Sequence, residues 1–193
     1  MLCDPFNQLV NLILQIYTMD TFIPEILNQA SRNKDESKVL TLGAFAFILQ
    51  QILYFAPSKR TDIDTFKFES FVFLYRSASL TNTQIQEYEA LIDKKDKHGY
   101  GRTIAFKGFI SCTLDPKVAE RYTQHMKKDK LKNVVMYRIN WEKPCDYYLL
   151  NFGCFENDQE VLLTDGMQLL VQSVQKIKGS DGESKMLITL KNA

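Results

Sequence analysis

The spacing of apolar residues changes once along this chain, from a helical pattern before about residue 57 to a strand-like pattern after about residue 68. Apolar side chains recur every three to four positions in the first stretch, and short β-prone runs separated by turn residues fill the second. Helices first and strands afterwards are typical of an α+β protein. We therefore expect one domain over residues 1–193, with a helical N-terminal part (1–56) packed on a mostly antiparallel β-sheet core (68–191).

The N-terminal part is predicted to contain three helices. Residues 5–32 form two of them, and Asp20 or Thr21 is the expected cap of the second. Residues 38–55 form the third helix, which has apolar residues on nearly every side. A helix of this kind is expected to be buried.

The C-terminal part is predicted to consist of strands with two short helices inserted. Thr81 is the expected cap of a helix over 81–93, and Asp115 followed by Pro116 opens another that ends near residue 126. The predicted strands cover residues 71–75, 104–113, 133–141, 146–150, 159–163, 168–177 and 185–190. Gly166 and the glycines between 179 and 182 supply turns.

Charge and hydropathy exclude several classes of partner. Lys and Arg number 24 against 23 Asp and Glu, so the formal charge is +1 and the bulk charge favours neither nucleic acid nor an anionic membrane. No apolar run approaches the roughly 20 residues of a membrane-spanning helix. The N-terminus lacks the basic region of a secretory signal. We expect a monomer in the cytoplasm, or one delivered into a host cytosol, with no nucleic acid partner and no membrane span.

The cysteines and histidines do not have the spacing of a metal site. Cys3, Cys112, Cys145 and Cys154 form no C-x-x-C pair, and the two histidines lie far apart in the sequence. We therefore expect no metal. Thiols are favoured over disulfides, although Cys145 and Cys154 could bridge across a loop.

Three short polar elements lie on apolar, strand-like runs. They are Tyr75-Arg76-Ser77, Phe109-Ile110-Ser111-Cys112-Thr113 and Asp158-Gln159-Glu160. A guanidinium can hold a diphosphate in two places at once, and a carboxylate can hold a ribose hydroxyl and stabilise a developing oxocarbenium charge. Each element alone is more often structural, as a surface ion pair or a strand-end acid. Together they indicate chemistry on a dinucleotide.

In order and strand context, these elements resemble the mono-ADP-ribosyltransferases of the arginine-serine-glutamate class, which includes cholera-toxin-like and ecto-enzyme members. In that family a strand carries aromatic-Arg-Gly, a second carries Phe-x-Ser-Thr-Ser, and a third carries Glu-x-Glu before Val-Leu. Residues 17–32 also resemble the N-terminal helices of the family. The resemblance implies the ADP-ribosyltransferase fold and the transfer of ADP-ribose from NAD to a protein, with NAD as co-substrate.

The resemblance also assigns roles to the motif residues. Arg76 would clamp the diphosphate or the neighbouring ribose, Ser111 would brace the pocket and the catalytic acid, and Glu160 would bind the ribose 2′-hydroxyl and stabilise the oxocarbenium-like cation. The NAD pocket would further include Tyr75, Ser77, Phe109 and Thr113. Ser77 replaces the usual glycine, and it can serve if its backbone does not need a positive φ.

The acceptor is left open by one departure from the family pattern. Asp158 stands where the family has the acid that meets the acceptor, and it is one methylene shorter than glutamate. Three alternatives remain. The loop that carries Asp158 lies closer to the acceptor, or Glu156 contacts the acceptor in place of Asp158, or the acceptor is not arginine but a hydroxyl such as a threonine of ubiquitin. Residues 147–158 would form the acceptor loop, with Phe152 and Phe155 as the aromatic contacts.

Three functions therefore follow from the sequence as hypotheses. The first is a protein mono-ADP-ribosyltransferase of the effector or toxin type. The second is an NAD glycohydrolase, in which water replaces the protein acceptor. The third is a non-catalytic member of the family that binds a partner, which the presence of Arg76, Ser111 and Glu160 argues against.

Overall fold

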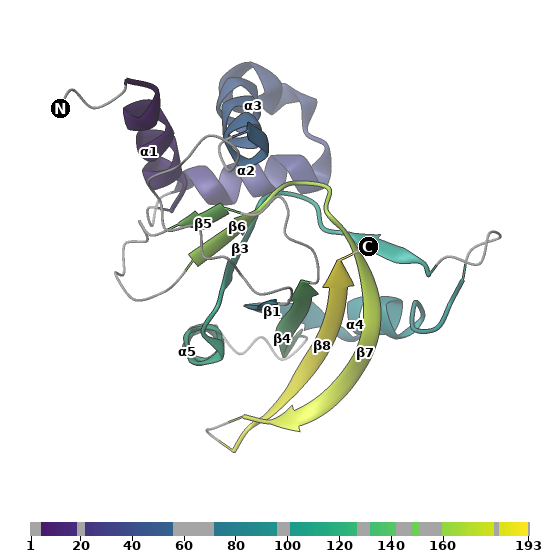
Figure 1. The fold of residues 1–193 in the computed structure, drawn as a ribbon. Helices are drawn as coiled ribbons and strands as arrows, with labels where there is room; N and C mark the ends of the chain where they lie inside the picture. Colours follow the sequence, from purple (N-terminus) through teal and green to yellow (C-terminus); the bar gives the residue numbers. More distant parts are fainter. Residues whose placement is uncertain are drawn as a thin grey trace. The chain divides into compact units, whose positions relative to one another are not determined.

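The structure is a computed structural model that describes residues 5–18, 22–55, 72–95, 101–126, 132–141, 148–150, 160–179 and 182–192 (Figure 1). The chain divides into two compact units. The first comprises Met1–Lys67, Phe106–Ser111 and Cys145–Met167, and the second comprises Phe68–Ala105, Cys112–Pro144 and Gln168–Ala193. That all 193 residues form one transferase domain stays a prediction.

The first unit contains the predicted N-terminal helices. They are α1 (Pro5–Thr18), α2 (Phe22–Asn33) and α3 (Val39–Phe55), with a short 3-10 helix, η1 (Glu36–Lys38), before α3. Asp35 caps η1, because its side chain accepts a hydrogen bond from the backbone N–H of Ser37. The predicted caps Asp20 and Thr21 lie outside the described residues.

A hydrophobic core holds the helices of the first unit together. Its buried members come from the three helices and from two later segments of the chain: Val10, Ile13, Leu14, Tyr17, Leu27, Leu49, Ile52, Leu53, Phe109 and Leu162. The strands of this unit are β5 (Tyr148–Leu150) and β6 (Glu160–Leu163), which pair antiparallel with Leu150 opposite Glu160.

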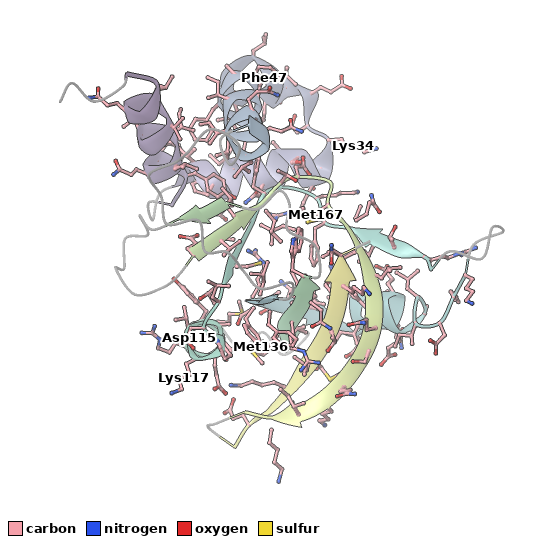
Figure 2. The ribbon with its side chains drawn as sticks, in the orientation of Figure 1. Lys34, Phe47, Asp115, Lys117, Met136 and Met167 are labelled. Carbon is pink, nitrogen blue, oxygen red and sulfur yellow. The ribbon has the colours of Figure 1, made fainter. Side chains whose placement is uncertain are left out.

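The prediction that residues 38–55 form a buried helix is wrong for one side of α3. Leu49, Ile52 and Leu53 are buried, whereas Leu40 is 96% exposed and Phe47, labelled in Figure 2, is 61% exposed. The core of the first unit takes up only one side of the helix, and an apolar sequence does not specify how many neighbours a helix will find.

The second unit is a sheet with two helices. Its strands run in the order β2 (Thr103–Ala105), β7 (Gln168–Lys178), β8 (Ser184–Asn192), β4 (Lys132–Trp141), β1 (Val72–Thr81) and the second half of β3 (Ile110–Thr113). The first half of β3, Ile110 and Ser111, belongs to the first unit. Neighbouring strands are antiparallel except β4 and β8, which are parallel. β7 and β8 form the long yellow-green pair in Figure 1. The predicted α+β fold with a mostly antiparallel sheet is confirmed.

The two inserted helices begin where their caps were predicted. α4 (Asn82–Glu89) starts after Thr81, which forms a capping box with Gln84. α5 (Pro116–His125) starts after Asp115, whose side chain accepts a hydrogen bond from the backbone N–H of Lys117 at 2.8 Å; Figure 2 labels both residues. Helix capping depends on local side-chain chemistry, so the starts of both helices were predicted from the sequence. The end of α4 was not, because the helix stops at Glu89 and not at residue 93.

Two predicted strands differ from those of the structure. β1 continues to Thr81, so Arg76 lies inside a strand rather than at its end. The single strand expected over residues 104–113 is interrupted between β2 and β3. Gly108 adopts a positive φ of 86° in the interruption, which favours glycine and is incompatible with an extended strand.

Candidate active site

A hydrogen bond between Ser111 and Glu160 forms the centre of the candidate site in the first unit. The Ser111 hydroxyl donates to Oε1 of the Glu160 carboxylate. Ser111 lies on β3, and Glu160 is the first residue of the neighbouring strand β6. Both side chains are half-buried. The structure therefore joins two of the three residues that the sequence motifs single out, although 49 positions separate them.

Side chains from two helices anchor the backbone that leads to Ser111. The backbone N–H of Phe109 donates to Oδ1 of Asn28 at 2.8 Å, and the Tyr17 hydroxyl donates to the Phe109 carbonyl at 3.2 Å. The Asn28 amide also donates to the Tyr17 hydroxyl at 2.9 Å. The Tyr17 ring meets the Phe109 ring edge-on, with the ring centroids 5.8 Å apart. Phe109, expected in the NAD pocket, thus lies in the core of the first unit.

The Asp165 carboxylate, in the turn after β6, binds the backbone of Gly108, the residue before Phe109. Asp165 accepts hydrogen bonds from the backbone N–H of Gly108 at 2.6 Å and from the Ser31 hydroxyl. A side chain at position 108 would also meet Asn28, because a Cβ built there lies 2.7 Å from its Oδ1 atom. Asn28 and Asp165 together anchor the segment between β2 and β3 that leads to Ser111.

The motif search missed Tyr17, Asn28 and Asp165. Asn28 and Tyr17 lie on α2 and α1, in the segment that resembles the helices of the transferase family. Asp165 precedes Gly166, so its turn was predictable. The partners of these side chains were not predictable, because Asn28 and Phe109 are 81 positions apart and Asp165 and Gly108 are 57 positions apart.

Arg76 lies in the second unit, on β1. Its Cα partner on the antiparallel strand β4 is Tyr137. Arg76 is half-buried, whereas Tyr137 is 2% exposed. Burial is the main cause that raises the pKa of Tyr137, and the positive charge of Arg76 acts in the opposite direction.

Tyr75 and Thr113 face one side of the same sheet. Tyr75 is paired with Thr113 on β3 and with Arg138 on β4, and partners directly across a sheet share a face. Burial raises the pKa of Tyr75, and the charge of Arg138 partly opposes this. Thr113 is 6% exposed. Since side chains alternate along a strand, Arg76 lies on the opposite side, with Tyr137.

Ser77 does not need a positive φ, which was the condition for a serine to replace the glycine of the family at this position. It lies in β1, and among the described residues other than glycine only Lys34 and Asp93 have a positive φ. The Ser77 hydroxyl donates to the Ala119 carbonyl of α5. A serine in place of the glycine of the family therefore needs no strained backbone here.

The expected acceptor residues Phe152, Phe155, Glu156 and Asp158 lie outside the described residues. Among the residues that are described, no cluster of three or more His, Cys, Asp or Glu side chains is placed to bind a metal ion. Cys112 is a buried thiol, and the other cysteines lie outside the described part. No helix in that part is long and apolar enough to cross a membrane.

A family model described as ADP-ribosyltransferase exoenzyme matches residues 62–193, which is more than half of the chain. The chain belongs to this family. ADP-ribosyltransferases are enzymes that use NAD as co-substrate, so the prediction of an NAD-dependent ADP-ribosyltransferase is confirmed at the level of the family. No curated protein sequence matches the chain.

Solved structures of toxins share the fold of this ADP-ribosyltransferase. Plx2a, an ADP-ribosyltransferase toxin from Paenibacillus larvae, has a TM-score of 0.63 and 13% identity, covering 96% of this chain and 86% of Plx2a. Vis toxin from Vibrio splendidus has a TM-score of 0.62 and 13% identity, with 95% and 72% covered. An ADP-ribosyltransferase from Clostridium botulinum has a TM-score of 0.59 and 14% identity, with 95% and 85% covered. The expected ADP-ribosyltransferase fold is confirmed.

Proposed function

We propose that this chain is a mono-ADP-ribosyltransferase of the arginine-serine-glutamate class, which transfers ADP-ribose from NAD to a protein side chain and releases nicotinamide. Arg76, Ser111 and Glu160 would serve the same NAD molecule. The family match supports the use of NAD. The three motif residues, which occur in family order, support the assignment to the class.

The hydrogen bond from Ser111 to Glu160 is the observation that carries the proposal. It holds one oxygen of the carboxylate in a fixed direction. A carboxylate can accept about four hydrogen bonds, so this bond is compatible with another from the 2′-hydroxyl of a ribose. As the bond between nicotinamide and C1′ breaks, positive charge develops on the ribose, and a pre-positioned carboxylate stabilises that charge.

Arg76 would hold the negative charge of NAD. A guanidinium offers five donors in a planar fork, which suits the diphosphate. Tyr75, Ser77, Phe109 and Thr113 would shape the rest of the pocket.

The acceptor is proposed to be an arginine or a hydroxyl, and two observations favour different answers. One structure similar to this chain is Vis in complex with agmatine, a compound that carries a guanidinium group. Asp158, however, is shorter than the glutamate expected for transfer to arginine, and a misplacement of about 1 Å can cost on the order of 100-fold in rate. Asp158, or Glu156 in its place, would orient the nucleophilic side chain of the acceptor protein. Phe152 and Phe155 of this chain would pack against that protein. A threonine of ubiquitin fits the hydroxyl alternative.

The same short acid favours NAD glycohydrolase activity as a second candidate, because a poorly oriented protein nucleophile would leave the site to water. In both cases the enzyme would act in the cytosol, either that of its own cell or that of a host, since its fold is that of known toxins. It would act as a monomer and without a metal.

Incubation with NAD labelled in the adenine ring and with a cell lysate tests the proposal. The proposal predicts label on protein, together with free nicotinamide, and mass spectrometry of the labelled peptides then identifies the acceptor residue. Only free ADP-ribose would identify the glycohydrolase. Glu160→Gln should abolish both products, whereas Glu89→Gln, an exposed glutamate on α4, should abolish neither. Equal nicotinamide release by Glu160→Gln and the wild type would refute the site.

A further inference from the structure

Two buried tyrosines meet through their hydroxyl groups in the second unit. The hydroxyl oxygens of Tyr88 on α4 and Tyr137 on β4 are 3.0 Å apart, and the ring centroids are 5.8 Å apart. Tyr88 is 6% exposed and Tyr137 is 2% exposed. Burying a hydroxyl costs free energy unless it is hydrogen-bonded, and two phenylalanines would fill the same space without that cost. The hydroxyls therefore need an explanation beyond packing.

Arg76 lies directly beside this pair. Arg76 and Tyr137 are opposite each other on β1 and β4, so their side chains share one face of the sheet with Cβ atoms about 5 Å apart. α4, which carries Tyr88, contacts β1 and β7. The positive charge of Arg76 also acts on the Tyr137 hydroxyl.

The hydrogen bond between the tyrosines can run in either direction, because either hydroxyl could be the donor. A cation attracts the lone pairs of the Tyr137 oxygen and repels its proton. The charge of Arg76 therefore favours the arrangement in which Tyr137 donates to Tyr88 and keeps its oxygen lone pairs for the guanidinium. In this arrangement Tyr88 fixes the Tyr137 hydroxyl, and the Tyr137 hydroxyl in turn restricts the side chain of Arg76.

We propose that Tyr88 and Tyr137 are positioning residues, which hold the Arg76 guanidinium in the orientation that binds the diphosphate of NAD. The inference rests on the proposed function of Arg76. An arginine side chain has several rotatable bonds, and ordering them in advance removes a cost that binding would otherwise incur. Tyr137 lies opposite Arg76 in the sheet, and neither tyrosine is assigned to the reacting atoms, so loss of the pair should affect the affinity for NAD rather than the chemical step.

Steady-state kinetics of nicotinamide release by Tyr137→Phe tests the proposal. We expect the KM for NAD to rise roughly tenfold, the effect of losing one oriented partner of a charged group, with kcat changed by less than about twofold. Tyr88→Phe should show the same change in smaller degree, because Tyr137 keeps its oxygen. Tyr122→Phe, at a half-exposed tyrosine of α5, serves as the control and should leave both constants unchanged.

A double-mutant cycle with Arg76→Ala separates positioning from general damage to the fold. Tyr137→Phe should have no further effect on KM when Arg76 is already absent. A tenfold rise in KM in both backgrounds, or an unchanged KM in Tyr137→Phe alone, would overturn the inference while leaving the proposed function intact. An unchanged KM in Arg76→Ala would instead refute the proposed role of Arg76, and the inference with it. The double variant Tyr88→Phe, Tyr137→Phe should remain folded, because two apolar rings replace a hydrogen-bonded pair of hydroxyls. Its KM for NAD can therefore be measured in the same way.

Discussion

Asn28→Ala tests whether the side chain of α2 really fixes the backbone before Ser111. The substitution removes the acceptor of the buried Phe109 N–H and the donor to the Tyr17 hydroxyl. An unsatisfied buried N–H costs about 1–3 kcal/mol, and the lost bond to Tyr17 adds about 1 kcal/mol. We expect the free energy of unfolding to fall by about 2–4 kcal/mol, which lowers Tm by roughly 6–12 °C for a chain of this length.

Hydrogen exchange at the Phe109 amide measures the effect where it arises. A loss of 2–4 kcal/mol in local stability corresponds to exchange that is roughly 30- to 1000-fold faster. Asn28→Asp keeps an oxygen for the Phe109 N–H and loses the donor to Tyr17, so its effect should be smaller. Asn33→Ala is the matched control, because Asn33 is an exposed residue at the end of the same helix and should change stability by less than about 0.5 kcal/mol.

Equal exchange at Phe109 in Asn28→Ala and Asn33→Ala would refute this reasoning. It would mean that water or a rearranged side chain replaces Asn28 at no cost. Ser111 would then owe its position to the pairing of β3 alone. Faster exchange throughout the first unit, with no larger effect at Phe109, would instead indicate that α2 is displaced as a whole.

Three further predictions concern stability. Gly108→Ala should lower the free energy of unfolding by about 1–3 kcal/mol in urea titrations, because it forces a side chain into a positive φ; no loss would contradict the backbone assigned there. Glu120→Gln should cost about 2 kcal/mol, because Lys185 is 5% exposed and its amino group lies 3.1 Å from the Glu120 carboxylate; an unchanged urea midpoint would show that the pair is unimportant. Burial raises the pKa of Tyr88 and Tyr137 in the folded state, so stability is complete below the ordinary tyrosine pKa of about 10 and is lost as pH rises beyond it. Absorbance titration should show both tyrosines ionising only as the protein unfolds, and ionisation in the folded state would contradict their burial.

Local features of the fold were well predicted from the sequence. The change in apolar spacing predicted the helices of the first unit and the strands of the second, because each element repeats its own periodicity over many residues. Thr81 and Asp115 were identified as helix caps because a cap is a hydrogen bond between residues only two or three positions apart. These predictions required no knowledge of distant contacts.

Features that depend on distant contacts were not predictable. The break between β2 and β3 is held by Asn28 and Asp165, which lie far from Gly108 in the sequence. The exposed side of α3 depends on how many elements pack against it, which its composition does not reveal. The Ser111–Glu160 contact was anticipated only through the resemblance to a family, because a serine and a glutamate on separate strands carry no signal of their own.

Nicotinamide release by purified protein, measured together with NAD binding by calorimetry, tests the central claim most directly. If Glu160 stabilises the cation formed on the ribose and Ser111 holds Glu160, then Glu160→Gln should lower kcat by at least about 100-fold and Ser111→Ala by about tenfold, with NAD affinity within about threefold of the wild type in both. Wild-type kcat in Glu160→Gln, with NAD still bound, would contradict the account.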